Sequence, residues 1–327
     1  MEYVFRKFNF PRRFGVELEV GHEIKKPTIR RQILSVSNKD VHTSRYNLST
    51  NNDYWHVKDD ATCGVKGHSG PKGVEIASFI ASGLKDLNHI CDVADHLLKY
   101  GVKVNNNCGL HIHVDVSDIS EDQMSRILAS WVRVEPFLAL TVPFMRVISP
   151  YAEPYFLMFY RLDIDPLNKI VSPQEVYRAL KPQDLSYYEN FDRRRTLNLV
   201  NYCRAIKEGH NTRKTIEFRW PEGTLCAEDI KNWVRLFVNF VEHAKDIKYV
   251  IRKGHPTLNE VMYLLGLGHT KEKFAILSDG LLTTKAWLLN RLIKNPDFNQ
   301  GFVSCWKLPI YHKKECEEYL NFISECN

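Results

Sequence analysis

Three short segments of the chain carry ionisable side chains two residues apart. These pairs are Glu17 and Glu19 in VELEV, His111 and His113 in GLHIHV, and Glu217 and Arg219 in TIEFR. The residues between and beside them are apolar, which predicts three β-strands with one packed face and one polar face. Because residues i and i+2 of a strand point to the same side, each pair should project together from the polar face.

The residue types on this predicted polar face favour metal-dependent chemistry over a merely solvated surface. Glu75 in GVEIAS adds a carboxylate from a fourth predicted strand. Clustered carboxylates repel one another unless cations neutralise them. Carboxylate and imidazole ligands without a thiolate suit Mg²⁺ or Mn²⁺, whereas the many carboxylates argue against a closed structural zinc site. Paired divalent metals beside an arginine are the usual equipment for phosphoryl transfer.

Several motifs, in the same order along the chain, resemble those of the amidoligase family of glutamine-synthetase-like carboxylate–amine ligases. They are FGVELEV, WHVKDDAT, GVEIAS, CGLHIHV, RRRTLN and TIEFRWPEGTL, and the resemblance covers roughly residues 13–245. It implies an ATP-dependent ligase that forms an amide or peptide-like bond through an acyl phosphate. The implied cofactors are ATP and two divalent metal ions, Mg²⁺ or Mn²⁺.

The resemblance also implies a set of metal ligands. These are Glu17, Glu19, Glu75, His111 and Glu217. Glu17, with His111 and Glu217, would serve the metal near the ATP phosphates. Glu19, joined by Glu75, would serve the metal near the substrate carboxylate.

Further roles follow from the resemblance for residues around the metals. His113 would lie near a phosphate or the acyl phosphate, and Arg219 would neutralise charge on the transferring phosphoryl group. Arg193 and Asn198, in RRRTLN, resemble a further substrate or phosphate contact, although the register within the three arginines is open. Asp60 matches an Asp-Gly-Ser-like loop, here Asp60-Ala61-Thr62. We expect Asp60 or a neighbouring carboxylate to accept the amine proton.

Patterns along the rest of the chain predict an α+β fold with a glutamine-synthetase-like curved, largely antiparallel sheet and helices packed on one face. Strands are predicted at 14–20, 73–79, 109–116, 196–203 and 214–220, and a short strand and turn at 55–63. Helical spacing appears around 87–98 and 230–241, and Ser/Thr–Gln/Glu pairs at 120/123, 172/175 and 257/260 predict capping boxes. The polar segment 21–56 is expected to be a loop or insertion. We predict a catalytic domain over 1–245 and a mostly helical extension over 246–327 that packs on it.

Composition limits the location and partners of the protein. The 327 residues have a net charge of +6, and their basic pairs are scattered, so nucleic acid is not required, although a modified nucleotide stays open as a substrate. The chain shows no apolar leader and no stretch long enough to cross a bilayer. None of its eight cysteines forms a CxxC motif, so we expect free thiols and a cytoplasmic protein. We expect Cys108 to be a packed side chain and not a nucleophile. Small-molecule or peptide substrates are expected, and homo-oligomerisation stays open.

Two other functions are compatible with these residues. A phosphotransferase on a similar sheet, resembling a guanidino kinase, would also use ATP but would leave a phosphorylated product. A non-catalytic metal- or peptide-binding module could keep the fold without the activity. The complete set of polar residues on the predicted sheet favours an enzyme over such a module.

Overall fold

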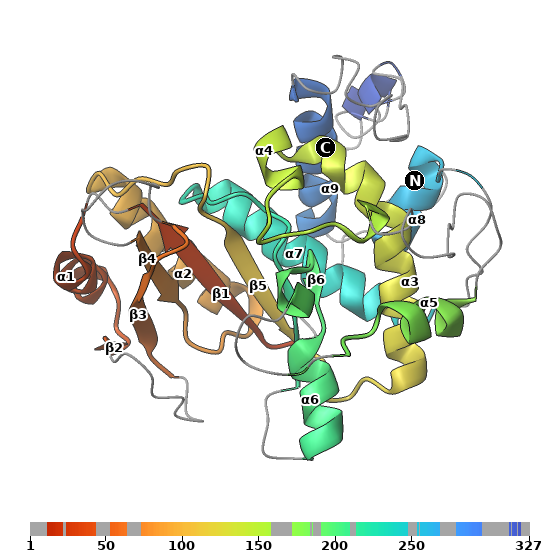
Figure 1. Cartoon of the computed structure of the whole chain (residues 1–327). Helices are drawn as coiled ribbons and strands as arrows, with labels where there is room; N and C mark the ends of the chain where they lie inside the picture. Colours follow the sequence, from red (N-terminus) through yellow and green to blue (C-terminus); the bar gives the residue numbers. More distant parts are fainter. Residues whose placement is uncertain are drawn as a thin grey trace.

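A computed structural model describes most of the chain (Figure 1). The described residues are 12–21, 24–43, 53–63, 73–157, 172–183, 185, 191–209, 214–247, 254, 256–268, 279–295, 314, 316–318 and 320–321. They form a mixed α+β structure around one open sheet, as the sequence predicts.

The sheet has seven strands in the order β2-β3-β4-β1-β5-β7-β6. The strands are β1 (Phe14–Val20), β2 (Val41–His42), β3 (Trp55–Asp60), β4 (Gly73–Ala77), β5 (Leu110–Asp115), β6 (Leu197–Asn198) and β7 (Thr215–Phe218). Neighbouring strands are antiparallel, except that β2 and β3 are parallel. The largely antiparallel sheet predicted from the sequence is therefore confirmed.

Alternation along β1 divides the sheet into an apolar and a polar face. Phe14, Val16 and Leu18 are buried in the core, whereas Glu17 and Glu19 point to the other side. The residues of β5 and β7 alternate in the same way, and their apolar side chains lie in the core. The paired polar side chains of β1, β5 and β7 therefore project from the same face of the sheet.

Helices connect and cover these strands. They are α1 (Lys26–Val36), α2 (Gly83–Lys99), α3 (Glu121–Leu138), α4 (Phe144–Val147), α5 (Pro173–Leu180), α6 (Val200–Glu208), α7 (Ala227–Ala244), α8 (Leu258–Leu264) and α9 (Asp279–Lys294). Short 3₁₀ turns are η1 (Ala139–Thr141), η2 (Tyr155–Leu157) and η3 (Phe191–Arg194). In Figure 1, α2 and α7 run behind the strands, and α7 contacts β5 while α1 contacts β3.

Aromatic side chains join the sheet to the helices. The indole of Trp131 in α3 packs edge-on against Phe218 of β7 and against Phe237 and Phe240 of α7. Phe218 and Phe237 stack with ring centroids 4.2 Å apart. Burying these large rings fixes the end of β7, and with it the polar side chains of that strand.

The last described helices share this core. Leu288 and Leu289 of α9 and Val261 of α8 are fully buried in the same apolar cluster as the sheet residues. Trp287 packs edge-on against Trp233 of α7, with ring centroids 4.9 Å apart. Whether 1–245 forms a separate catalytic domain stays a prediction.

Three predicted helix starts can be compared with their hydrogen bonds. Complete capping boxes begin α3 at Ser120 and α5 at Ser172, so these two predictions are confirmed. At α8, the Thr257 hydroxyl accepts the Glu260 N–H at 3.2 Å, which is the first half of the predicted box.

Two segment predictions differ from the structure. Residues 21–56, expected to be a loop or insertion, are not simply a loop, because they contain α1 and β2; α1 buries only Ile29 and Ile33 along an otherwise polar sequence. Their origin as an insertion stays a prediction. Residues 196–203, expected to be a strand, form the two-residue β6 followed by α6. The apolar residues of that segment pack into the core from a helical turn, so a short apolar run did not distinguish strand from helix.

A buried carboxylate ties α3 to the loops beside β6 and β7. Glu135 accepts hydrogen bonds from the Trp131 indole N–H at 3.2 Å, from the Phe156 backbone N–H at 2.9 Å and from the Thr196 hydroxyl. The Thr196 carbonyl in turn accepts the Arg219 N–H at 2.8 Å. Burial raises the pKa of Glu135 to about 7, against the hydrogen bonds that lower it.

We expect Glu135→Ala to lower the free energy of unfolding by about 3 kcal/mol, because it leaves the buried Phe156 N–H and Thr196 hydroxyl without an acceptor. The Trp131 indole N–H would keep only the Thr196 hydroxyl oxygen as its acceptor, at 3.1 Å. Urea denaturation of both proteins measures this loss. Glu135→Gln keeps an acceptor oxygen, so its loss should be smaller. Equal stability of the alanine variant and the wild type would contradict a structural role for this carboxylate.

In the described part of the chain, no helix has the length and apolar character needed to span a bilayer. The described cysteines are free thiols, as expected. They are Cys63, Cys91, Cys108, Cys203, Cys226 and Cys316.

Candidate metal-binding and catalytic site

The strand register places the predicted polar residues opposite one another. Glu17 of β1 faces His111 of β5, and His113 of β5 faces Glu217 of β7. Directly opposed residues of antiparallel strands have Cβ atoms about 5 Å apart. Residues separated by up to 200 positions in the chain therefore form one cluster in the middle of the sheet.

His111 lies at the centre of this cluster. Its Nδ1 is 3.3 Å from Oε2 of Glu17 and 3.4 Å from Oε1 of Glu217. Its Nε2 is 3.4 Å from Oε1 of Glu19. A single buried imidazole thus contacts three carboxylates from two strands.

His113 completes a second group in the same cluster. Its Nε2 lies 3.2 Å from Oε1 of Glu17 and 4.0 Å from Oε1 of Glu217. One ligand atom from each of Glu17, His113 and Glu217 lies within 4.8 Å of the other two, close enough for one metal ion to bind all three. The sequence assigned His111 to this metal and His113 to a phosphate, whereas the geometry makes His113 the third member of this group.

Charge and burial compete at these residues. Burial opposes ionisation of Glu17, but the charge of His113 and hydrogen bonds from both histidines bring the pKa of Glu17 well below its usual range. Burial likewise opposes ionisation of Glu217, but the charges of Arg219 and the histidines lower its pKa to about 2. Burial lowers the pKa of His113, yet the carboxylates of Glu17 and Glu217 raise it overall. The cluster therefore holds ionised carboxylates.

Glu75 lies beside the cluster on β4, opposite Glu19 in the strand register. Its Oε1 is 2.6 Å from the Nζ of Lys58, which comes from the next strand, β3. Burial and the nearby charge of Glu17 raise the pKa of Glu75 to about 8, although Lys58 lowers it. The sequence analysis missed Lys58, whose position in WHVKDDAT, two residues before Asp60, places it on the same strand face.

Arg219 and Asn198 lie at the opposite end of the cluster, where both contact Glu217. The Nη1 of Arg219 donates to Oε1 of Glu217 at 2.6 Å, and its Nε donates to the Tyr151 carbonyl at 3.0 Å. The Nδ2 of Asn198 donates to Oε2 of Glu217 at 2.7 Å. Both predicted residues therefore hold Glu217 in place, and their contacts with a substrate stay predictions.

Arg193 lies in η3, which precedes β6 in the chain. Its neighbour Arg195 pairs with Glu153 at 2.6 Å. A role for Arg193 stays a prediction.

A second buried arginine, Arg146 of α4, reaches the cluster from outside the sheet. Its Nε donates to the Trp220 carbonyl at 3.2 Å, and its Nη2 donates to the Arg219 carbonyl. Burial and the charge of Arg219 lower the pKa of Arg146 to about 10, although Glu19 raises it. The sequence analysis missed this residue. The feature that could have indicated it is a single charged residue, Arg146, near the end of the apolar stretch FLALTVPFMRV.

Gly109 lets Arg146 and His111 approach each other. A Cβ at position 109 would stand 2.6 Å from Nη2 of Arg146 and 2.9 Å from Nε2 of His111, closer than real contacts allow. The Gly109 backbone N–H also donates to Oε2 of Glu19 at 2.5 Å. A side chain at this position would therefore displace the cluster.

We expect Gly109→Ala to destabilise the protein by about 1–3 kcal/mol, because neither neighbouring side chain can move without losing its partners. Thermal unfolding measures this change. Gly15→Ala is the matched control on the adjacent strand, because a Cβ there would meet only His113 Cβ, at 3.9 Å. Equal melting temperatures for the two variants would contradict the close packing at Gly109.

Asp60 lies at the end of β3, beyond Lys58. Its Oδ1 accepts hydrogen bonds from both the N–H and the hydroxyl of Thr62, each at 2.7 Å. The carboxylate is therefore held in a tight turn. One ligand atom each from Glu19, Asp60 and Cys63 lie within 4.8 Å of one another. The Cys63 thiol therefore lies beside the carboxylates at this end of the cluster, a residue type that the ligand set expected from the sequence did not include.

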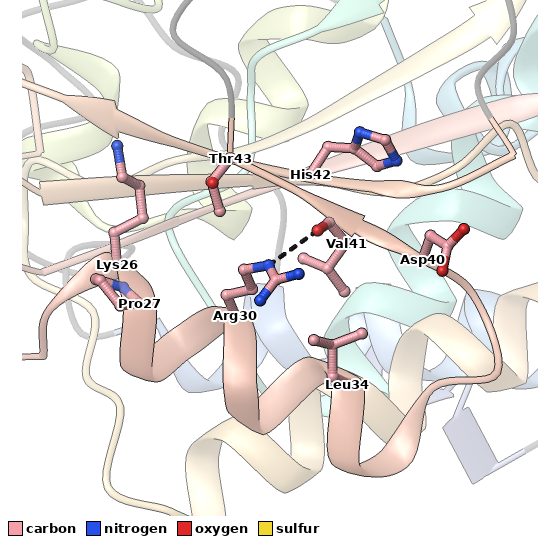
Figure 2. Close-up of a pocket in the computed structure, with 8 residues that line it drawn as sticks. All are labelled: Lys26, Pro27, Arg30, Leu34, Asp40, Val41, His42 and Thr43. Carbon is pink, nitrogen blue, oxygen red and sulfur yellow. Dashed lines mark hydrogen bonds between the residues drawn. The ribbon is translucent and has the colours of Figure 1, made fainter.

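A groove lies elsewhere, at the β2 edge of the sheet (Figure 2). It has a volume of about 550 Å³ and is lined by Lys26, Pro27, Arg30, Leu34, Asp40, Val41, His42 and Thr43. Figure 2 shows Arg30 donating to the Val41 carbonyl, at 3.0 Å. Two strands, β3 and β4, separate this edge from β1, so the groove is distinct from the carboxylate cluster.

Comparison with known protein families gives one match. Residues 10–241 match the model of a family described as "Putative amidoligase enzyme". This range contains every residue of the cluster described above. No curated protein matches the chain.

Proposed function

The chain belongs to the amidoligase family, and on that premise we propose that it is an ATP-dependent carboxylate–amine ligase. Family membership indicates a ligase-type enzyme. The proposed reaction forms a carbon–nitrogen bond, in an amide or peptide-like product, through an acyl phosphate. We also propose that its sheet is of the glutamine-synthetase type and that the reaction takes place on the polar face.

The observation that carries this proposal is the convergence of acidic, imidazole and guanidinium groups from three adjacent strands. Glu17, His111, His113, Glu217 and Arg219 contact one another through the distances given above. A carboxylate is a poor electrophile until ATP phosphorylates it. Joining ATP to a carboxylate requires groups that hold several anionic oxygens together while charge moves.

The donor set fits divalent metal ions. Carboxylates predominate, which suits Mg²⁺, and two imidazoles make Mn²⁺ equally acceptable. The Nε2 of His113 is buried and lies 3.2 Å from Oε1 of Glu17, so an ion bound by Glu17 would also be within reach of this nitrogen. We propose Glu17, His113 and Glu217 as ligands, with His111 beside them, and Glu19 with Glu75 for a second ion. When bound, these ions would neutralise phosphate oxygens.

The charge balance of the site supports anionic substrates. Four carboxylates lie among three permanently cationic groups. The carboxylates belong to Glu17, Glu19, Glu75 and Glu217, and the cationic groups to Lys58, Arg146 and Arg219. Because the pKa of Glu75 is raised to about 8 and that of His113 is also raised, these charges nearly balance, and two divalent cations would make the site positive. A site of that kind attracts the triphosphate of ATP together with a carboxylate substrate.

Residues of the chain itself would position the reacting groups. Arg219, held by Glu217 and by the Tyr151 carbonyl, has its guanidinium fixed at the end of the cluster. We propose that it neutralises charge on the transferring phosphoryl group. Asp60, at the other end, is proposed to accept the proton that the attacking amine loses.

Product analysis tests this function. The protein would be incubated with ATP, Mg²⁺ and mixed amino acids or a cell extract, and the products identified by mass spectrometry. The expected result is ADP together with a new amide whose formation requires ATP. A phosphorylated product that accumulates without an amide would instead identify a phosphotransferase, and ATP that stays intact under all conditions would contradict catalysis.

A further inference from the structure

Two buried thiols lie next to the Glu19 end of the cluster. Cys63 follows β3 and Cys108 precedes β5, and both side chains are almost completely buried. The Cys108 S–H donates to Oδ1 of Asn105 at 3.5 Å, and the next residue, Gly109, donates its N–H to Oε2 of Glu19 at 2.5 Å. Glu19, Asp60 and Cys63 form one group of possible ligands, and the charges of Glu19 and Asp60 act on both thiols.

Backbone contacts hold the two cysteines in place. The Asn105 side-chain amide donates to the Cys63 carbonyl at 2.9 Å, and the Asn105 backbone N–H donates to the Cys108 sulfur at 3.5 Å. One asparagine therefore connects the segments that carry the two thiols. The pair is built into the fold from two parts of the chain that are distant in sequence.

Two glycines make room for the cysteines. A Cβ at Gly73 would stand 2.3 Å from Cβ of Cys63, and a Cβ at Gly223 would stand 2.5 Å from Cβ of Cys108. Neither position tolerates a larger residue without displacing a cysteine. Each cysteine therefore needs its own neighbouring glycine in order to lie at its position near the carboxylates.

The ordinary interpretation of a buried cysteine is a small apolar side chain. Apolar packing does not account for thiols placed beside two carboxylates. The neighbouring Cys108 and burial raise the pKa of Cys63, and the charges of Glu19 and Asp60 raise it further. A bound cation would reverse this effect, because metal coordination favours the thiolate and neutralises the carboxylates.

We propose that Cys63, Cys108, Glu19 and Asp60 bind a divalent cation of the zinc class as two thiolates and two carboxylates. The ligand atoms of Glu19, Asp60 and Cys63 already lie within 4.8 Å of one another. Bonds of about 2.0–2.3 Å to zinc require only a small contraction of this group. Binding replaces two S–H protons by the metal ion, so two protons leave for each ion bound.

This site uses Glu19, which the proposed ligase reaction assigns to a Mg²⁺ ion. Thiolate ligands favour zinc-class ions over Mg²⁺. Zinc occupancy would therefore withdraw Glu19 from the Mg²⁺ site, and zinc would inhibit the ligase. The zinc-class site itself does not depend on the ligase activity.

Titration of the reduced full-length protein with Co²⁺ tests the inference, because cobalt–thiolate bonds absorb in the near ultraviolet. We expect this absorption in the wild type, its displacement by Zn²⁺, and its loss in Cys63→Ser/Cys108→Ser. Cys91→Ser is the matched control, since Cys91 is buried and donates only to the Ala227 carbonyl, at 3.5 Å. Glu217→Gln should also keep the absorption, because Glu217 belongs to the other ligand group.

A second readout uses the wild type alone and so avoids any folding defect of the serine variants. Zn²⁺ should slow alkylation of Cys63 and Cys108, located by peptide mass spectrometry, and leave Cys91 unaffected. No cobalt–thiolate absorption in the wild type, or absorption that persists in the folded double variant, would overturn the proposal. Either result would leave the ligase proposal intact, and a missing amide product would leave the cation site intact.

Discussion

Arg219→Ala is expected to lower ATP-dependent turnover by about 10³-fold while ATP binding weakens much less. The guanidinium stands at the end of the cluster, 2.6 Å from Oε1 of Glu217, a proposed metal ligand. A cation placed there stabilises charge that develops only in the transition state. Its loss should therefore reduce kcat more than it reduces the affinity for ATP. ATP turnover and ATP affinity, measured on the same preparation, check this expectation.

The alternative role of Arg219 is structural. The ion pair with Glu217 and the hydrogen bond to the Tyr151 carbonyl, at 3.0 Å, could serve only to hold β7 and the neighbouring loop. In that case the variant would lose stability or metal affinity before it lost turnover. Arg219→Lys separates the two roles further, because it keeps the charge and loses the fork of donors.

Arg133→Ala is the control for removing a buried ion pair elsewhere. Arg133 is as buried as Glu217 and pairs with Glu260 at 2.9 Å, in the contact between α3 and α8. This variant should lose stability and keep its turnover per folded molecule. If Arg219→Ala also keeps its turnover, or simply unfolds, the catalytic assignment of Arg219 fails.

The strands with strong alternation could be predicted from the sequence almost to the residue. β1 runs over the predicted 14–20, and β5 and β7 lie inside their predicted ranges. Alternation works there because one face packs against helices while the other carries polar groups. In contrast, α1 buries only Ile29 and Ile33, so its sequence looks like a polar loop. Its helix depends on contacts with β3 and α2, which no local pattern reveals.

The candidate site, like the fold, could be predicted only where a local sequence pattern determines it. Pairs two residues apart on a strand could be predicted, because side chains alternate between the two faces. Which strands are neighbours depends on the order of the sheet, so the contacts of His111 with three carboxylates required the structure. Arg146 comes from α4, and Cys63 follows a strand end, so neither belongs to an alternating pattern. These residues reach the site through tertiary packing alone.

Glu17→Ala/Glu19→Ala is expected to weaken the binding of Mg²⁺ or Mn²⁺ by more than about 100-fold. Changing residues that only support metal ligands already costs 10–100-fold in affinity. Here two proposed ligands disappear, one from each proposed ion. Glu17 lies 3.2 Å from the Nε2 of His113, and Glu19 lies 3.4 Å from the Nε2 of His111, so both imidazoles also lose a carboxylate neighbour. Calorimetric titration of each protein with Mn²⁺ measures the change.

The variants must separate lost ligands from a lost fold. Glu19 accepts the Gly109 N–H, so Glu17→Gln/Glu19→Gln keeps an acceptor there and should also bind Mn²⁺ poorly while melting close to the wild type. Asp59→Asn removes a carboxylate from β3 that pairs with Lys26 at 2.7 Å and faces away from Glu75, so it should bind Mn²⁺ like the wild type. Undiminished Mn²⁺ binding by the folded glutamine variant would show that these carboxylates hold no metal ion. The carboxylates of the polar face would then serve only as partners of its histidines, Lys58 and Arg219, and the proposed ATP chemistry would lose its basis.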